Sequence, residues 1–406
     1  MSVEEIPAID ERFMQHTHEW LAEQRGPVCP VHTAWGWPSY LITGYEDARA
    51  ALTDPRVSKN NQGAHELMAA KLGEENLGAG FGELLSANML NSDPPDHTRL
   101  RKLVNKAFTS RTVARLRPRV EEITGELLDE MARHEQLDLM AAFALPLPIT
   151  VICELLGVRP EDRGEFSGWS NTLLSGGGEE PAVIEDAAAR MQGYLVKLVE
   201  DKRVEPAEDL LSELVQATDE GDALSEQELV GMAFLLLVAG HETTVNLIGN
   251  ATLALLRAPD QAAKLRAEPS LLPGAVEEFL RFDGPINIAT IRYTTEDVAV
   301  GGTTIPAGEF VRVSLLAANR DEGRFPDPAD LDVTRPAGGH LAFGHGIHYC
   351  VGAPLARLEA EVALGSLLNR FPDLALAVPE EQLRYRSSTL VHGLRELPVR
   401  LGAARR

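Results

Sequence analysis

The chain is poor in cysteine, in aromatic residues and in positive charge. Of its 406 residues three are cysteines and 5% are aromatic, and 38 Lys+Arg stand against 61 Asp+Glu. Cys29, Cys153 and Cys350 are odd in number, far apart and never in a Cys-x-x-Cys pair, which excludes a disulfide framework and a four-thiolate zinc site. At most one of the three cysteines is therefore expected to do chemistry.

The shortage of positive charge and of long apolar runs narrows the possible partners. A formal net charge of -23 repels nucleic acid and anionic membranes. The longest uninterrupted apolar run, residues 232–239, is far shorter than the ~20 residues of a membrane-spanning helix. Residues 1–20 are acidic where a signal or transit peptide would be basic. We therefore expect a cytoplasmic protein with no membrane and no nucleic-acid partner.

The chain does contain helical periodicity and a few strand-like stretches. A hydrophobic content of 44% excludes disorder, and the lack of a sustained repeat excludes collagen-like and coiled-coil architectures. Residues 112–134 place apolar side chains at the i, i+3, i+4 spacing of an amphipathic helix. Strands are predicted at 39–42, 297–300, 303–305 and 310–315, with Gly301-Gly302 as a hairpin turn. We expect a mainly α protein with small β-sheets.

Three irregular regions, residues 58–93, 175–181 and 319–346, interrupt the helical pattern. The first two are consistent either with mobile lids over a pocket or with surface loops that have no role. The third is longer than a compact domain tolerates without a reason. None has the low-complexity character of an interdomain linker, so residues 1–406 are predicted to form a single domain.

A long helix is predicted to begin after Ser225 and to run to about Arg257. Ser225 and Glu228 fit a capping box, and a length of roughly 48 Å would cross the whole domain. The centre, residues 239–245, contains a glycine, two threonines and a valine, which are poor helix formers. A kink or widened turn is expected there, as often occurs at functional sites. Close helix packing and threonine bonds to i−4 carbonyls are an equally good structural explanation.

The densest group of unusual residues is Phe-Gly-His-Gly-Ile-His-Tyr-Cys-Val-Gly, residues 343–352. Pro354 and the helix formers after it place Cys350 just before a helix N-terminus, where the dipole and free N–H groups stabilise a thiolate. The glycines leave room for a bulky group near the backbone. Taken alone, this segment leaves three roles open for Cys350. They are an inert buried thiol, a zinc ligand together with His345 and His348, and the axial ligand of a haem iron. The zinc alternative lacks a fourth ligand nearby.

This segment resembles the haem loop of cytochrome P450s at every fixed position of Phe-Gly-x-Gly-x-His-x-Cys-x-Gly, a highly specific pattern. Residues 278–281 are similar to the family's Glu-x-x-Arg motif. Glu-x-x-Arg occurs six times in the chain, so only the place of this copy before the cysteine loop identifies it. The resemblance implies a structural ion-pair network of Glu278, Arg281 and Arg335. It extends from about Gly44 to the C-terminus and is greatest to soluble actinobacterial members that act on macrolides and other secondary metabolites.

The resemblance also implies a fold and a cofactor. The fold would be the cytochrome P450 fold, a triangular prism-like helical domain that encloses haem b. Cys350 would be the iron ligand, which leaves Cys29 and Cys153 as ordinary residues. The haem propionates would be bound by His97, Arg101, Arg292 and His348. The other haem contacts implied are Ala239, Gly240, Thr244, Phe343, Gly344 and Gly352.

The implied activity is haem-thiolate monooxygenation. O2 and two electrons enter, one oxygen atom hydroxylates or epoxidises a hydrophobic macrolide, polyketide, terpenoid or similar metabolite, and water leaves. Residues 239–244 match the family's central helix motif, in which Thr243 would hold the proton-delivery hydrogen bonds and Glu242 would feed them from solvent. A haem sensor without turnover and a peroxide-driven peroxygenase are the alternatives, and the Glu242-Thr243 pair argues against both. By analogy the substrate contacts are Met89, Leu90, Leu236, Ile286, Ile288, Ala289 and Thr290.

The expected electron donor is an acidic ferredoxin with its NAD(P)H-dependent reductase, acting on a monomer. Residues 97–120 contain no Asp or Glu but eight Lys or Arg. The resemblance implies that this segment lies beside the protein surface on the cysteine-ligand side of the haem, where an acidic ferredoxin would dock. Arg111 and Arg115 in it, with Arg357 after Cys350, are expected to steer the ferredoxin, an effect on association rate that salt screens.

Overall fold

The computed structural model describes residues 6–24, 26–33, 36–73, 82–174, 180–219 and 221–405. Residues 175–179, most of the second predicted irregular region, and residues 74–81, a small part of the first, lie outside the described residues. The remainder of the first region is largely helical and not irregular, because it contains α4 (Asn61–Leu72), α5 (Gly82–Ser86) and η2 (Met89–Asn91).

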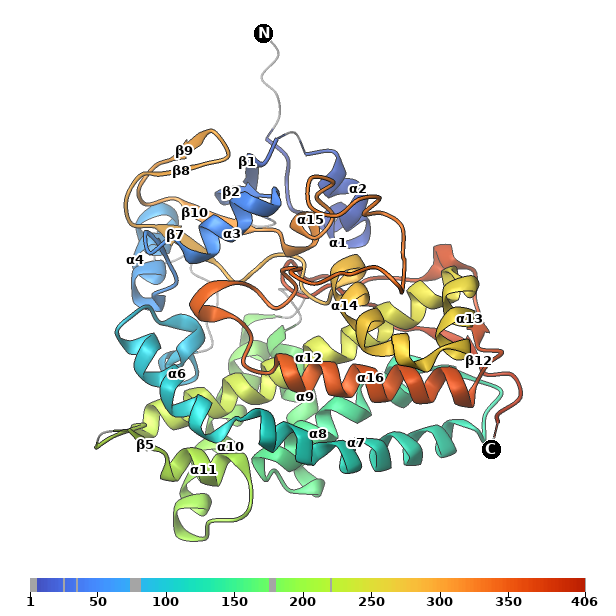
Figure 1. Ribbon diagram of the computed structural model, residues 1–406. Helices are drawn as coiled ribbons and strands as arrows, with labels where there is room; N and C mark the ends of the chain where they lie inside the picture. The colour runs from blue at the N-terminus through green and yellow to red at the C-terminus, as the bar shows by residue number, and fades with distance from the viewer. Residues whose placement is uncertain are drawn as a thin grey trace.

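A mixed five-stranded sheet lies on one side of the molecule, near the N-terminal helices (Figure 1). Its strands, in spatial order, are β1 (Val28–His32), β2 (Pro38–Ile42), β10 (Phe310–Val313), β7 (Arg292–Thr294) and β3 (Val57–Ser58). β2 and β10 are parallel and the other pairs are antiparallel. The predicted strand 39–42 is confirmed within β2, and the predicted strand 310–315 is confirmed only to Val313, because Ser314 caps the helix α15 (Leu315–Ala318). β1 escaped prediction because it contains Pro30, which is tolerated at an edge.

The remaining strands form small sheets. The predicted hairpin is confirmed as β8 (Val298–Val300) and β9 (Thr303–Ile305), and its turn residues Gly301 and Gly302 both have positive φ, as a two-residue hairpin turn requires. The other strands are β4 (Gln136–Asp138), β5 (Thr218–Asp219), β6 (Asp222–Ala223), β11 (Ala375–Leu376) and β12 (Pro398–Arg400), with β11, β12 and β4 in one sheet and β5 paired with β6.

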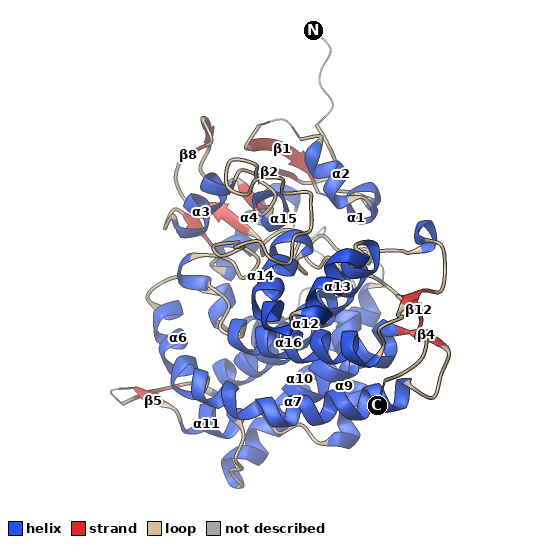
Figure 2. Cartoon of the chain, turned by 45° about the vertical axis from the view of Figure 1, so that its right-hand side comes forward, coloured by secondary structure: helices blue, strands red, loops and turns tan. Residues whose placement is uncertain are grey.

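Helices make up most of the described chain (Figure 2). The α-helices are α1 (Glu11–Gln15), α2 (Thr17–Ala22), α3 (Tyr45–Thr53), α4 (Asn61–Leu72), α5 (Gly82–Ser86), α6 (Asp96–Ala107), α7 (Ser110–Met131), α8 (Pro146–Leu156), α9 (Arg163–Leu174), α10 (Pro181–Val204), α11 (Leu210–Gln216), α12 (Glu226–Arg257), α13 (Pro259–Ala267), α14 (Leu272–Asp283), α15 (Leu315–Ala318) and α16 (Ala353–Arg370). Short 3-10 or π turns are η2 (Met89–Asn91), η3 (Met140–Ala144), η4 (Pro160–Asp162), η5 (Pro269–Leu271), η6 (Gly346–His348) and η7 (Glu380–Gln382).

α12 is the central helix and packs against α5, α8, α10, α14 and α16. The predicted capping box is confirmed, because Ser225 accepts from the backbone N–H of Glu228 while the Glu228 side chain accepts from that of Ser225. α12 is one uninterrupted α-helix, so the widened turn expected at residues 239–245 is not present. Among the described residues it alone is long and apolar enough to span a membrane, yet 78% of its most apolar window is buried inside the protein. It is therefore a core helix.

Candidate functional site

The cysteine loop lies between η6 and the start of α16. The Cys350 N–H donates to the Phe343 carbonyl at 3.0 Å, and Gly352 is the N-cap of α16, as predicted. Gly344 has φ +74°, a conformation that L side chains rarely adopt. Desolvation raises the pKa of the Cys350 thiol, whereas the N–H groups of Gly352 and Ala353 and the nearby charge of Arg101 act to lower it. The loop thus offers hydrogen bonds to a thiolate, the form that ligates iron.

A cluster of cationic and donor side chains lies close to this loop. The His97 and His348 rings are 4.4 Å apart between centroids, and Arg101 donates to the Tyr349 carbonyl at 2.8 Å. The pKa of His348 is lowered to about 2 by burial and then by the charges of Lys59, His97 and its arginine neighbours. Burial also lowers the pKa of Arg292 to about 10. The structure therefore brings together all four predicted propionate ligands.

Lys59 belongs to the same cluster and was not predicted. It is buried, its Nζ donates to Thr290 Oγ1 at 2.7 Å, and desolvation together with the charge of Arg292 lowers its pKa well below the usual value. The carboxylate of Asp93 accepts from the Lys59 backbone N–H at 3.1 Å. No local pattern marks a lone lysine after a two-residue strand as functional, so only the fold identifies it.

This cluster fits the carboxylates of haem b. Both ring nitrogens of His97 are buried without a hydrogen-bond partner among the described residues, which is costly unless a ligand supplies one. Clustered cations likewise need anions between them. Two propionates beside a thiolate ligand would satisfy both requirements. The residues present therefore fit haem b.

The middle of α12 provides an open strip in an otherwise buried helix. Between residues 229 and 255 every side chain is buried except Leu235, Ala239, Gly240 and Thr243. Residues 235, 239 and 243 follow the i, i+4, i+8 spacing of one helix face. Of the predicted haem and oxygen contacts on α12, Ala239, Gly240 and Thr243 lie where the helix is accessible. Thr244, also predicted to contact haem, is instead buried.

The alternative explanation for residues 239–245, close helix packing and threonine hydrogen bonds to i−4 carbonyls, is also supported. A Cβ on Gly240 would come within 2.8 Å of Ile152 Cδ1, so the glycine permits close packing of α8 on α12. The Thr243 hydroxyl donates to the Ala239 carbonyl at 3.1 Å, the i−4 bond that threonines form in helices. Neither contact interrupts the helix, which explains why it stays regular despite its poor helix formers.

Glu242 is buried and does not reach solvent directly. Its Oε2 accepts from Arg386 Nη1 at 2.8 Å, while its Oε1 has no hydrogen-bond partner among the described residues. Arg386 comes from the segment after η7 and is partly exposed. The sequence gives no indication of this arginine, which is 144 residues away along the chain. A proton path from solvent to Glu242 would therefore pass Arg386.

A second buried carboxyl, Glu359, was also not predicted. It lies on α16, nine residues after Cys350, and is fully buried, with no hydrogen-bond partner for either carboxyl oxygen among the described residues. Desolvation raises its pKa well above the usual value, an effect that the nearby Thr244 hydroxyl partly offsets. Burial therefore favours the protonated form of Glu359 more than it would for an ordinary glutamate.

The predicted Glu-x-x-Arg ion-pair network is confirmed. Both carboxylate oxygens of Glu278 accept from Arg281, at 2.7 and 2.8 Å, and Oε1 also accepts from Arg335 Nε at 3.1 Å. Arg281 donates further to the carbonyls of Asn319 and Pro328, at 3.0 and 2.9 Å. This network explains the long irregular segment 319–346, whose backbone carbonyls accept from the buried Arg281 and the partly exposed Arg335.

The predicted substrate contacts divide into two groups. Leu90, Ile286, Ala289 and Thr290 are partly exposed, whereas Met89 and Leu236 are buried. Ile288 instead packs into a core cluster with Phe13, Leu41 and Leu316. Ile288 is therefore a core residue and not one of the accessible positions of this segment.

The basic residues near the cysteine loop are more fully paired than expected. Arg357 makes a bidentate ion pair with Glu277, at 2.6 and 2.9 Å. The hydrogen bonds from Arg357 and His340 outweigh burial and lower the pKa of Glu277 to about 2. Arg115 is exposed on α7, whereas the side chain of Arg111 lies outside the described part. Arg357 is thus not a free steering charge.

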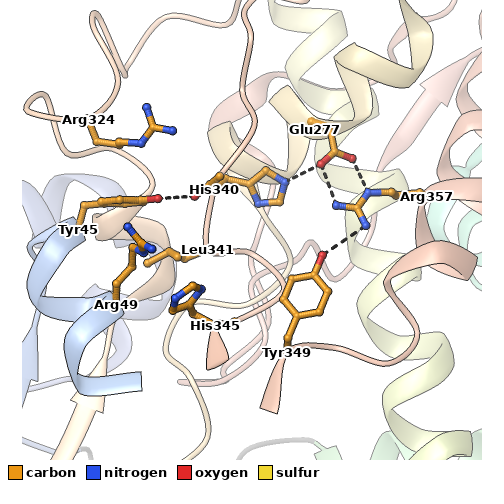
Figure 3. A pocket seen from close by; sticks show the side chains of 11 residues that line it. Tyr45, Arg49, Glu277, Arg324, His340, Leu341, His345, Tyr349 and Arg357 are labelled. Carbon is orange, nitrogen blue, oxygen red and sulfur yellow. Dashed lines mark hydrogen bonds and ion pairs between the residues drawn. The ribbon is translucent and has the colours of Figure 1, made fainter. Parts of the chain in front are cut away.

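A surface pocket of about 510 Å³ adjoins the cysteine loop (Figure 3). Arg49 of α3, Arg324 and His345 line it together with Tyr349. Arg49 has one long ion pair, 3.6 Å to Glu46, and Arg324 donates to the Gly338 carbonyl at 2.9 Å. Ile347 and Tyr349 are exposed on the same loop. Sequence reasoning missed Arg49 and Arg324 because they lie far from the basic segment in the chain.

Comparison with known proteins supplies independent evidence. The Cytochrome P450 family model matches residues 182–384. Cytochrome P450 107B1 of Saccharopolyspora erythraea is 52% identical over 99% of this chain and 100% of its own length, and Vitamin D(3) 25-hydroxylase of Pseudonocardia autotrophica is 52% identical over 96% and 95%. The solved structure of the tirandamycin C-bound P450 monooxygenase TamI is similar at a TM-score of 0.90 and 52% identity, covering 98% of this chain and 100% of TamI.

Proposed function

This chain belongs to the cytochrome P450 family of haem-dependent monooxygenases, and we propose that it hydroxylates or epoxidises a large hydrophobic secondary metabolite of the macrolide, polyketide or terpenoid kind. The observation that carries the site assignment is the unpartnered His97 within a buried cationic cluster beside the Cys350 loop. The hydroxylase and tirandamycin C-bound relatives support the substrate class.

Haem b, when bound to a cysteine thiolate, supplies the redox chemistry that uses O2 and two electrons to give one oxygen atom to the substrate and one to water. Cys350 is the proposed ligand, held by the N–H groups at the start of α16. His97, Arg101, Arg292 and His348 are proposed to hold the propionates. Lys59 completes this set through its contact with Thr290.

Thr243 and Glu242 are proposed to deliver protons. Thr243 lies on the accessible face of α12, so its hydroxyl can accept a bond from a water above the haem while it donates to Ala239. Glu242 lies one residue earlier on the buried side and contacts Arg386. Protons would thus travel from the partly exposed Arg386 side to Glu242 and on to the water network at Thr243.

The ligand assignment is tested by the spectrum of the reduced, CO-bound protein. Thiolate ligation gives a red-shifted Soret band, which Cys350→His should abolish. Cys29→Ala and Cys153→Ala should keep the band, because both cysteines are buried core residues. Loss of the band in either of these two variants would refute the assignment. A panel of macrolides, polyketides and terpenoids, screened for a low-spin to high-spin change of the haem spectrum, tests the substrate class.

The proposed electron donor is an acidic ferredoxin, supplied with electrons by an NAD(P)H-dependent reductase. The docking surface would combine the exposed Ile347 and Tyr349 with the charges of Arg49, Arg324 and Arg115. Steering of this kind fades as salt shortens the Debye length from ~10 Å at 0.1 M to ~3 Å at 1 M.

Stopped-flow measurement of the first electron transfer tests the docking surface. Arg49→Glu should slow ferredoxin-supported reduction and flatten its dependence on salt, with substrate affinity unchanged. Arg190→Glu is the matched control, because Arg190 is an exposed arginine of α10 paired with Asp186. A rate that does not depend on ionic strength, or an equal effect of both variants, would exclude this surface.

The remaining proposals concern the whole chain. We infer that residues 1–406 form a single domain, because α12 packs against helices from residue 82 to residue 370. A monomer in the cytoplasm fits the acidic charge and the core position of α12.

A further inference from the structure

Two histidines and an aspartate from distant parts of the chain meet away from the haem-binding cluster. His18 lies in α2, Asp283 ends α14, and His392 lies in the segment between η7 and β12. His18 Nε2 is 2.6 Å and His392 Nε2 is 2.9 Å from the same oxygen, Asp283 Oδ1. These three atoms all lie within 4.8 Å of one another.

The surrounding residues hold this arrangement firmly. Asn250 of α12 donates from Nδ2 to the carbonyls of Asp283 and His392, at 3.1 and 3.0 Å. The Tyr385 ring stacks on His392 at 4.8 Å between centroids and 13° between planes. The backbone of Asp283 and His392 is therefore fixed by these hydrogen bonds, and the His392 ring is held by stacking.

We propose that His18, Asp283 and His392 form a binding site for a divalent transition-metal ion, with zinc the ion it suits best. Two imidazole nitrogens and one carboxylate oxygen are a ligand set that zinc accepts, with a water in the fourth position. Zinc bonds of about 2.0 Å at tetrahedral angles separate ligand atoms by roughly 3.3 Å. Each present N···O distance would need to widen by less than about 1 Å.

The protonation states suit this role. Burial lowers the pKa of His18 to about 4, so its imidazole is neutral at pH 7. Burial acts to raise the pKa of Asp283, but hydrogen bonds from both imidazoles help to hold it well below its usual value. The side chain of His18 is 24% exposed, which provides an entry path and a place for the water ligand.

Two features weaken the site and set its affinity. The guanidinium of Arg320 donates to the Phe282 carbonyl and lies close enough to act on Asp283 and His18, so it opposes a cation. His392 Nδ1 is buried with no partner among the described residues, so metal binding at Nε2 leaves the Nδ1 proton unpaired. We expect a dissociation constant on the order of micromolar, weaker than that of structural zinc sites.

The consequence for the protein is a tie between α2 near the N-terminus, the end of α14 and the segment after η7 near the C-terminus. The segment that carries His392 also carries Arg386, the partner of Glu242. A bound ion would restrict this segment more than the two hydrogen bonds do.

The test uses the haem-loaded protein, treated with chelator and dialysed. Titration with zinc chloride in a calorimeter should show one ion per chain, and the thermal midpoint should rise with zinc concentration. X-ray absorption at the zinc edge should show nitrogen and oxygen ligands and no sulfur, which separates this site from the cysteines. Absence of stoichiometric zinc binding, or sulfur ligation, overturns the proposal.

A matched pair of variants locates the ion. His18→Gln should weaken zinc binding at least about 100-fold, because removal of a direct ligand costs no less than removal of an outer-shell partner. His16→Gln, an exposed histidine two residues earlier, should bind zinc as the unaltered chain does. Since His18 lies at the surface, its variant should fold even where Asp283→Asn does not. Equal zinc affinity in His18→Gln and the unaltered chain would refute the site. His18, Asp283 and His392 would then be a hydrogen-bonded group that binds no metal.

Discussion

Replacement of Glu278 by glutamine tests the buried ion-pair network with an internal control. Glu278 and Arg281 are both fully buried, and Arg335 binds the same carboxylate. Glutamine keeps the shape of the side chain but removes the charge, which leaves the buried guanidinium of Arg281 without its counter-ion and removes the ion pair of the partly exposed Arg335. Breaking a buried pair on one side costs about 3–5 kcal/mol.

The expected change in thermal midpoint follows from the size of the chain. An unfolding entropy of about 2.1 cal/mol/K per residue gives about 0.85 kcal/mol/K for 406 residues. A loss of 3–5 kcal/mol therefore lowers the midpoint by about 4–6 °C. Differential scanning calorimetry at one scan rate, together with the haem content of the purified protein, provides the measurement.

Another copy of the same motif serves as the control. Glu130 and Arg133 also form an i, i+3 ion pair, at 2.7 Å, but both side chains are more than half exposed. Exposed pairs contribute at most about 1 kcal/mol, so Glu130→Gln should move the midpoint by about 1 °C or less. A shift below 1 °C for Glu278→Gln, or equal shifts for both variants, would show that burial does not decide the energy of this motif.

Three further predictions address other parts of the site. Thr243→Ala should keep haem content and substrate binding but divert reducing equivalents to peroxide, measured as the ratio of product to NAD(P)H consumed; full coupling would contradict the proton-delivery role. Lys59→Met should speed haem transfer to apomyoglobin, because one propionate-facing charge is lost, while Lys59→Arg should not; equal rates would place Lys59 outside the haem contacts. The pKa of Glu359 is raised in the folded state, whereas in the unfolded state it is about 4.3. Above a pH of about 4.3 the unfolded state releases a proton that the folded state retains. The free energy of unfolding therefore falls as the pH rises from about 4.3 toward the pKa of the folded state. Glu359→Gln should thus gain in thermal midpoint relative to the unaltered chain between pH 5 and pH 8, and a difference that does not vary with pH would indicate an ionised Glu359.

Sequence reasoning succeeded where the structural cause is local. The capping box at Ser225, the hairpin turn at Gly301-Gly302 and the helix start after Cys350 each depend on residues within a few positions of one another. Their geometry follows from backbone preferences that neighbouring residues express in any fold. The regularity of α12 was predicted wrongly at Gly240, because contact with Ile152 of α8 stabilises the helix from outside.

The cysteine loop and the central helix motif are contiguous patterns, so the sequence by itself determined the family, the cofactor and the candidate iron ligand. The tertiary structure alone decided which buried charges meet: Lys59 with the propionate ligands, Arg386 with Glu242, and His18 with Asp283 and His392. These partners lie more than 100 residues apart in most cases and carry no motif. Their energies depend on desolvation and on distances of a few ångströms, which arise only when distant segments pack together.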